Sequence, residues 1–124
     1  MRMMFGLAAA LWIASPVSAQ SMNAEIFHQR AVKLQKKGAL AIFSRGEIKS
    51  LMNEAQAAAK RARAQRLATL KAGGKPRSCP PEGSSMGSDE FMRRLSAIPP
   101  TERARIDITE ATIRILASKY PCPA

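Results

Sequence analysis

Residues 1–19 constrain this chain most, because they predict where it folds and how much of it remains to fold. Arg2 gives a positive start, residues 5–14 form an apolar run, and Ala19 ends a stretch of small residues. This order is typical of a cleavable export signal, with cleavage expected before Gln20. The apolar run is shorter than the roughly 20 residues of a membrane span. A buried N-terminal helix is the alternative, whereas export predicts a periplasmic or secreted protein.

Two cysteines lie in the part that would remain after cleavage, residues 20–124. That length suits a single domain with a modest core. In an oxidising compartment an even count predicts one disulfide, Cys79–Cys122, with two free thiols as the alternative. We interpret the pair as structural, because no Cys-x-x-Cys motif and no setting that would lower a thiol pKa accompanies it.

The remaining sequence predicts an all-α fold, a small four-helix domain, because it contains neither period-two alternation nor an Asn-Gly or Asp-Gly hairpin turn. Asn23 is a suitable cap for the first helix, and Gly38 a suitable stop. Gly73 is expected to end the second helix. We expect helices over about residues 23–37, 44–72, 88–98 and 107–120, with a loop over 73–87.

The second helix carries the clearest start signal. Ser44 and Glu47 have the spacing of a capping box, and Phe43 and Ile48 that of a hydrophobic staple. Arg66 falls on the apolar face, so the last two turns are expected to project beyond the core. The expected buried stripe consists of Ile48, Leu51, Met52, Ala55, Ala58, Ala59 and Ala62.

The last two helices are expected to form an antiparallel hairpin over residues 88–120. Ser88 is the expected cap of the third helix, and Asp107, with Glu110, the cap of the fourth. A connecting turn is expected over 101–106. The disulfide would then close the open end of this hairpin. The expected inner stripe of the third helix is Phe91, Leu95 and Ile98, and the fourth helix is expected to be the most buried.

A formal charge of +10 on residues 20–124 points to an acidic partner. The few aromatic residues are not interleaved with the basic cluster, which argues against nucleic acid. A solvated helix end, with cations offsetting the helix dipole, is the plainer interpretation of that cluster. The candidate partner-binding residues are Lys60, Arg61, Arg63, Arg66, Lys71 and Glu82.

No pattern in the sequence predicts catalysis, and neither a metal site nor a cofactor is expected. His28 is the single histidine, which leaves no Ser-His-Asp or Cys-His arrangement and too few zinc ligands once the cysteines pair. Asp89 and Glu90 are explained by the start of a helix. Three methionines, Met52, Met86 and Met92, are interpreted as core or rim filler rather than a metal site.

The second half of the chain resembles the Rap/Tai-type immunity proteins, small exported helical proteins that neutralise cell-wall amidase effectors delivered by type VI secretion. The likeness covers about 45 residues. It rests on Cys79-Pro80-Pro81-Glu82-Gly83, Ile98-Pro99-Pro100 and Lys119-Tyr120-Pro121-Cys122-Pro123.

The resemblance implies an exported, non-catalytic binding protein that occupies its partner without turnover. The helix over 44–72 and the loop over 73–87 would supply the contact. The alternative is a cationic structural protein of the envelope that binds anionic lipid or cell-wall polymer. An amidase effector, another protein and a second copy of the chain all stay open as partners.

Overall fold

A computed structural model of the chain describes residues 21–124, and it confirms the all-α fold. The predicted export signal and its cleavage site lie outside the described residues. Within 21–124 no strand forms, and a single isolated bridge pairs Asn23 with Asp107. The elements are α1 (Ala24–Lys37), the 3-10 helix η1 (Gly38–Ser44), α2 (Arg45–Lys71), α3 (Ser88–Ala97), α4 (Pro100–Arg103) and α5 (Ile108–Lys119).

Two of the predicted caps form. The side-chain oxygen of Asn23 accepts hydrogen bonds from the amides of Glu25 and Ile26, at 2.9 and 3.1 Å. The side chain of Asp107 accepts from the amide of Glu110 at 2.7 Å. These bonds satisfy amides that a helix start leaves without partners, so the local sequence fixes where α1 and α5 begin.

The capping box predicted at the start of α2 is wrong. Ser44 makes no cap hydrogen bond, and its hydroxyl instead accepts from Lys37 Nζ at 2.9 Å. The Glu47 carboxylate binds the guanidinium of Arg30 through two bonds, of 2.6 and 2.7 Å. A bidentate charged pair is stronger than a bond to one backbone amide, which explains the outcome. Phe43 is 82% exposed, so the predicted staple is absent as well.

The structure also corrects two details near α3. This helix starts at Ser88 itself, with Gly87 in the cap position and no side-chain cap bond. The expected turn over 101–106 contains a short helix, α4. Pro100 occupies the first position of α4, where the fixed φ of proline favours helix and its missing N–H costs no bond.

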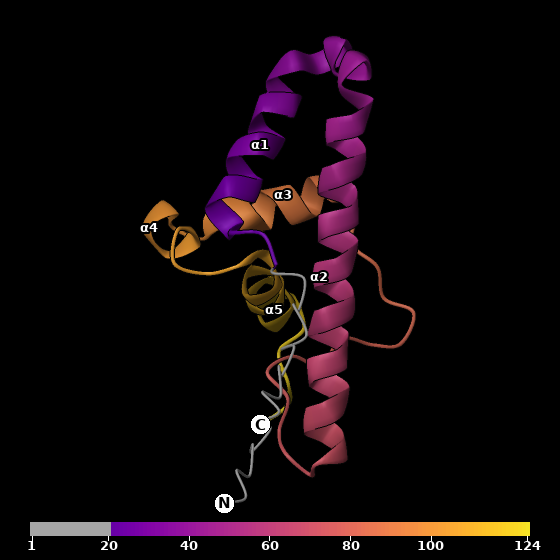
Figure 1. Cartoon of the computed structure of the whole chain (residues 1–124). Coiled ribbons are helices and arrows are strands. Elements are labelled where there is room, and N and C mark those ends of the chain that lie inside the picture. The colour runs from indigo at the N-terminus through magenta and orange to yellow at the C-terminus, as the bar shows by residue number, and fades with distance from the viewer. Residues whose placement is uncertain (1–20) are drawn as a thin grey trace, which may run out of the picture.

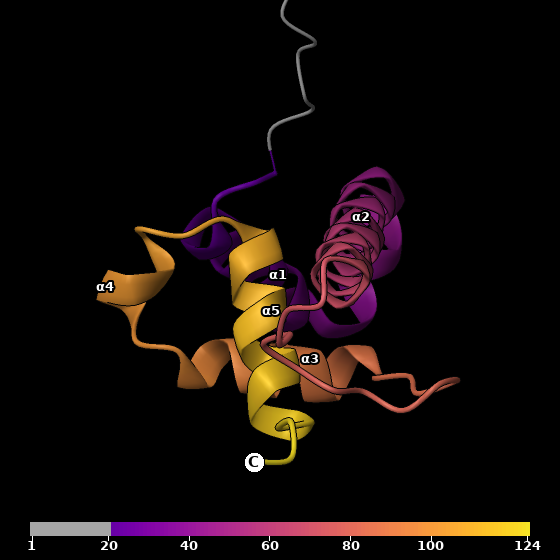
Figure 2. The same ribbon diagram turned by 90° about the horizontal axis from the view of Figure 1, so that it is seen from below.

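The long helix α2 is the frame on which α1, η1 and α5 pack (Figure 1). α1 and α2 form a hairpin joined by η1, and α5 crosses α2, as Figures 1 and 2 show from two directions. α3 and α5 pack on each other as predicted, but they cross one another rather than lying side by side, so the expected antiparallel hairpin does not form (Figure 2). As predicted, the C-terminal end of α2 projects beyond the core: its last buried residue is Ala62.

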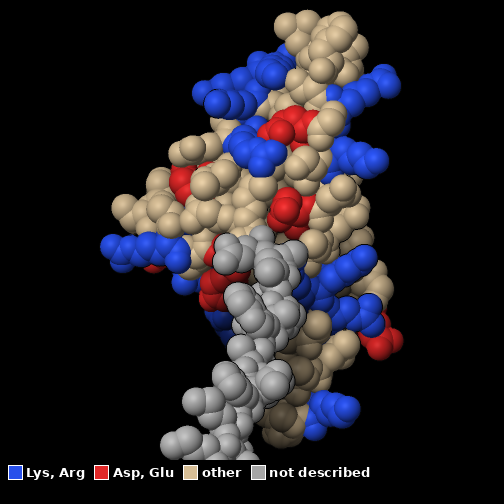
Figure 3. Space-filling model, in the orientation of Figure 1, with Lys and Arg blue, Asp and Glu red and all other residues tan. Residues whose placement is uncertain are grey.

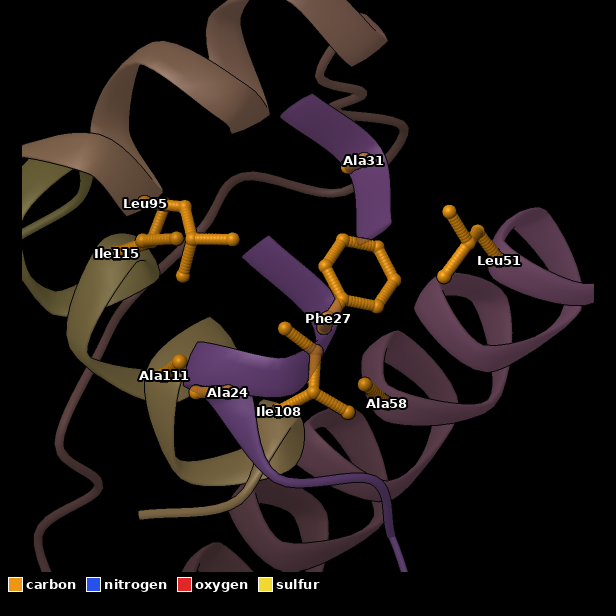
Figure 4. Packing of buried hydrophobic residues seen from close by; sticks show 9 residues of the cluster. All are labelled: Ala24, Phe27, Ala31, Leu51, Ala58, Leu95, Ile108, Ala111 and Ile115. Atoms are coloured by element: carbon orange, nitrogen blue, oxygen red, sulfur yellow. The ribbon is translucent and has the colours of Figure 1, made fainter. Parts of the chain in front are cut away.

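The core lies where α1, α2, α3 and α5 meet. Phe27 of α1 occupies the middle of the buried cluster, with Leu51 of α2 on one side (Figure 4). Its ring meets the edge of Phe91, with centroids 6.0 Å apart. Two expected members of the α2 stripe, Met52 and Ala59, are exposed, because α5 covers a narrower face than the stripe offers. As predicted, α5 is the most buried helix, through Ile108, Thr109, Ala111, Thr112, Ile113 and Ile115.

Arg103 of α4 joins three elements at the edge of this core, although it is only 4% exposed. Its Nε donates to the carboxylate of Glu25 at 2.6 Å. Its Nη1 donates to the carbonyls of Leu95, Ser96 and Ile98, at the end of α3. The bond from Arg103 is the main reason why the pKa of the Glu25 carboxyl is lowered. A buried guanidinium thus ties the start of α1 to the end of α3.

Backbone bonds hold the start of α1 against the start of α5. The amide of Ala24 donates to the carbonyl of Ile106 at 3.0 Å, and the amide of Ile108 donates to the carbonyl of Met22 at 2.7 Å. The side-chain amide of Asn23 donates to the carbonyl of Ala104 at 2.9 Å. The sequence left the packing of the first helix undetermined, and these bonds determine it.

The predicted disulfide is present. Cys79 and Cys122 are bonded, with 4.9 Å between their Cα atoms and a separation of 43 positions in sequence. The amide of Cys79 also donates to the carbonyl of Tyr120 at 2.8 Å. The chain before α3 is therefore fastened to the chain after α5.

Replacing Arg103 with leucine is expected to lower the free energy of unfolding by about 3 kcal/mol, because Glu25 and three carbonyls lose their donor. Arg105→Leu is the control, because Arg105 is exposed and lies two residues away; its effect should stay within about 0.5 kcal/mol. Urea unfolding followed by circular dichroism measures both. Equal effects of the two substitutions would contradict the role given to Arg103.

Stability is also expected to fall in acid. The pKa of Glu25 is lowered in the fold from its usual value of 4.5. Its contribution is therefore complete above that value and is lost as the pH falls through the lowered pKa. Glu25→Gln should flatten the decrease of the unfolding free energy below about pH 4.5, measured by urea unfolding across a pH series. A pH dependence as steep as that of the wild type would argue against this coupling.

Replacing both cysteines with serine is expected to destabilise the fold by about 4 kcal/mol, on the chain-entropy estimate for a loop of this length. Differential scanning calorimetry of the double variant and of the oxidised wild type measures the loss. Wild-type protein treated with a reductant should match the variant. A melting temperature unchanged by either treatment would show that the bond adds nothing.

Candidate functional site

An open groove of about 990 Å³ runs along α2, between this helix and the chain from Pro80 to Met92. α1 and α5 contribute to its floor. We call it the apolar groove, because apolar side chains from α1, α2, α3, α5 and the loop line it. They include Phe27, Met52, Leu67, Met86, Met92 and Leu116.

The apolar groove exists because α2 carries more apolar surface than the core covers. Its floor is the outer side of the core, where Leu51 of α2 and Ile115 of α5 are buried. Beside that floor Met52 is 56% exposed and Leu67 is 48% exposed. Methionine side chains are flexible and polarisable, so they adapt to partners of different shape. The groove can therefore bury an apolar segment supplied from outside the domain.

The structure brings three of the predicted partner-binding residues together in this groove. Arg63 and Arg66 line it from α2, and Glu82 lines it from the loop. Lys60 and Lys71 are exposed but are not part of its lining, and neither is the half-buried Arg61. Half of the predicted set thus shares one site.

The two groove arginines differ from the five arginines that hold carboxylates in the fold. Within residues 21–124, neither Arg63 nor Arg66 forms an ion pair with a carboxylate. The reason lies in the sequence, since residues 55–81 contain seven cations and no acid. By contrast, Arg30, Arg77, Arg94, Arg103 and Arg114 are all paired. The lining also contains two carboxylates, Glu82 and Asp89, on the side of the loop and α3. Positive charge is therefore available to a carboxylate of a partner on the α2 side of the groove.

His28 lies outside the lining of the groove. Its Nε2 and the hydroxyl of Ser96 are 2.9 Å apart, and burial, followed by the nearby Arg103, lowers its pKa. The uncharged form of this histidine is favoured, which suits a structural hydrogen bond between α1 and α3. In the described part of the chain, no three His, Cys, Asp or Glu side chains gather as a metal ion would require.

Sequence reasoning missed the groove itself. It assigned Met52 and Ala59 to the buried stripe, whereas both are exposed and line the groove. Met86 and Met92 do pack against the core, as the filler interpretation expects, but they line the groove as well. The signal was present in the width of the α2 stripe, which is broader than one crossing helix can cover. It could have been found by comparing that width with the surface that the neighbouring helices can cover.

Comparison with protein-family models, with curated proteins and with solved structures gives no match. Among residues 21–124, no helix combines the length and apolar character needed to cross a membrane.

Proposed function

We propose that this chain is an exported binding protein of the immunity type, which acts by occupying a partner protein and catalyses no reaction. The apolar groove would receive an apolar segment of that partner. The periplasm or the extracellular space would be the place of action. The observation that carries the proposal is one groove in which two arginines without an ion-pair partner among residues 21–124 lie beside exposed Met52 and half-buried Met86 and Met92.

The chemistry of the groove indicates the kind of segment that fits. Burial of apolar side chains against Met52 and Met92 would supply most of the affinity. A carboxylate of the partner near Arg63 and Arg66 would fix the orientation and speed the encounter. A helix laid into a groove, with an apolar face and an acidic edge, meets both demands. Such a segment is the expected ligand.

The resemblance of the C-terminal half to Rap/Tai-type immunity proteins suggests a cell-wall amidase effector as the partner. The residues of that likeness coincide with the groove in part. Pro80, Pro81, Glu82 and Gly83 all line it, and they follow the disulfide-bonded Cys79. Attachment to an anionic surface of the envelope, the alternative function, draws its support from another region, the turn between α1 and α2.

Arg63→Glu/Arg66→Glu should abolish capture of the partner from an envelope extract, because the groove would then repel acidic side chains. Lys60→Glu/Lys71→Glu is the matched control, with the same change of net charge outside the groove. Mass spectrometry identifies what the wild-type protein captures. With the purified partner, the association rate should fall at least about tenfold for the groove variant and should decrease with salt for the wild type.

A second variant tests the groove without a change of charge. Ala59→Trp would fill the groove from an exposed position on α2, so it should block capture while leaving the melting temperature near that of the wild type. Equal capture by both charge variants, or unchanged capture by Ala59→Trp, would reject the groove as the binding site.

A further inference from the structure

The turn between α1 and α2 exposes an unusual amount of apolar surface. η1 has the sequence Gly-Ala-Leu-Ala-Ile-Phe-Ser and contains no buried residue. Leu40 is 65% exposed, Ile42 59% and Phe43 82%. We call these three side chains the apolar tip. They lie at the end of the hairpin farthest from the C-terminus of the chain (Figure 1). Apolar surface of this kind is uncommon at a helical turn and marks a place of contact.

Cations surround the apolar tip. Residues 26–53 contain six Lys and Arg residues and a single acid, Glu47, which Arg30 already binds. Five cations remain, and Figure 3 shows such side chains in blue on both flanks of the tan tip. They lie on the last turns of α1 and the first turns of α2. They are Lys33, Lys36, Lys37, Arg45 and Lys49.

Three of these cations share a second hollow, directly beneath the apolar tip. Lys33, Lys36 and Lys37 line a shallow cleft of about 410 Å³, together with the Arg30–Glu47 pair. The excess of positive charge suits an anionic oxygen group such as a phosphate. Apolar side chains thus lie at the end of the hairpin, and cations that suit an anion lie one turn behind them. A membrane surface has the same order, with hydrocarbon inside and lipid phosphates outside it.

The hairpin is stiff enough to present this arrangement. Arg30 and Glu47 join α1 to α2 through two bonds close to the turn. Lys37 Nζ donates to the hydroxyl of Ser44, across the two ends of η1. Gly38 adopts a φ of 52°, which starts the turn and which other residues rarely adopt. The hairpin would therefore lose little conformational freedom on binding.

We propose that the apolar tip inserts into the outer layer of a bilayer containing anionic phospholipid, while the surrounding lysines bind lipid phosphates. The occupant is lipid rather than protein because cations lie on both helices that flank the tip, α1 and α2, as a flat anionic surface requires. The C-terminal end of α2 and the apolar groove would then face away from the membrane. This proposal does not depend on what the groove binds.

Tryptophan reporters test the orientation. The one native tryptophan, Trp12, lies in the predicted signal, so the reporters are made in a Trp12→Phe background and the N-terminus is determined first. Phe43→Trp places a reporter in the tip. Leu70→Trp is the control at the other end of α2, where Leu70 is half exposed. Vesicles of phosphatidylcholine, alone or mixed with phosphatidylglycerol, are then added.

We expect the emission of Phe43→Trp to shift to the blue with the anionic vesicles and to be quenched by brominated lipid, while Leu70→Trp stays unchanged. A shift of both reporters would mean that α2 lies flat on the surface, and it would overturn the proposal. So would the absence of a shift at residue 43.

Matched variants test the two components in vesicle sedimentation. Leu40→Ser/Phe43→Ser should weaken binding at least about tenfold, because the insertion of apolar surface is lost. Lys33→Glu/Lys36→Glu should remove the preference for phosphatidylglycerol, and Lys71→Glu/Lys75→Glu, with equal charge, should reduce it far less. If both charge variants lost the preference for phosphatidylglycerol equally, net charge alone would explain the preference, and the proposal would be wrong.

A protein contact at the tip would show itself differently. If analytical ultracentrifugation found a dimer that Leu40→Ser/Phe43→Ser dissociates, with no binding to vesicles, the tip would be an interface between two copies and the proposal would be wrong. Capture of the groove partner by the same variant should be unchanged, which separates this test from that of the groove.

Discussion

The buried guanidinium of Arg103 is the contact on which the arrangement of the helices depends. It donates to the Glu25 carboxylate and to three carbonyls at the end of α3, and hence satisfies groups from two elements far apart in sequence. A lysine could not replace it, because one ammonium cannot reach across this set in a plane. The position of α1 over α5 follows from this contact together with the backbone bonds of Ala24 and Ile108. The floor of the apolar groove follows in turn, since Phe27 of α1 and Ile115 of α5 both belong to it.

The same anchoring of α1 explains where positive charge without a carboxylate partner remains on the surface of the described domain. α1 is fastened at its start, through Arg103 and the bonds of Ala24 and Asn23 to the segment before α5. Its other end leads into η1, which has no packed neighbour besides the two helices that it joins. Most carboxylates lie in the packed region around the start of α1, α3 and α5, where they pair with basic side chains or cap helices. The remaining positive charge is therefore left at the tip and along the second half of α2.

Structural features that depend on neighbouring residues were predicted from the sequence, whereas features that depend on residues far apart in the chain were missed. The caps at Asn23 and Asp107 and the stop at Gly38 use bonds within a few residues, and all three were predicted correctly. Glu47 fits a local cap equally well, but Arg30, 17 residues away, binds it instead. Arg103 pairs across 78 residues, and no local pattern marks it. The groove was missed for the same reason, because which part of α2 stays exposed depends on where α5 crosses it.

The disulfide has a consequence for the groove as well as for stability. Cys79 directly precedes the residues from Pro80 onward that form one wall of the groove, and its bond to Cys122 holds that wall against the end of α5. Without the disulfide, this wall would be connected to α2 only through a loop rich in glycine and proline. Oxidation thus completes the groove as well as the fold. The shape of the apolar groove is therefore expected to depend on the redox state of its surroundings, because one covalent bond fixes both the C-terminal end of the chain and a wall of the groove.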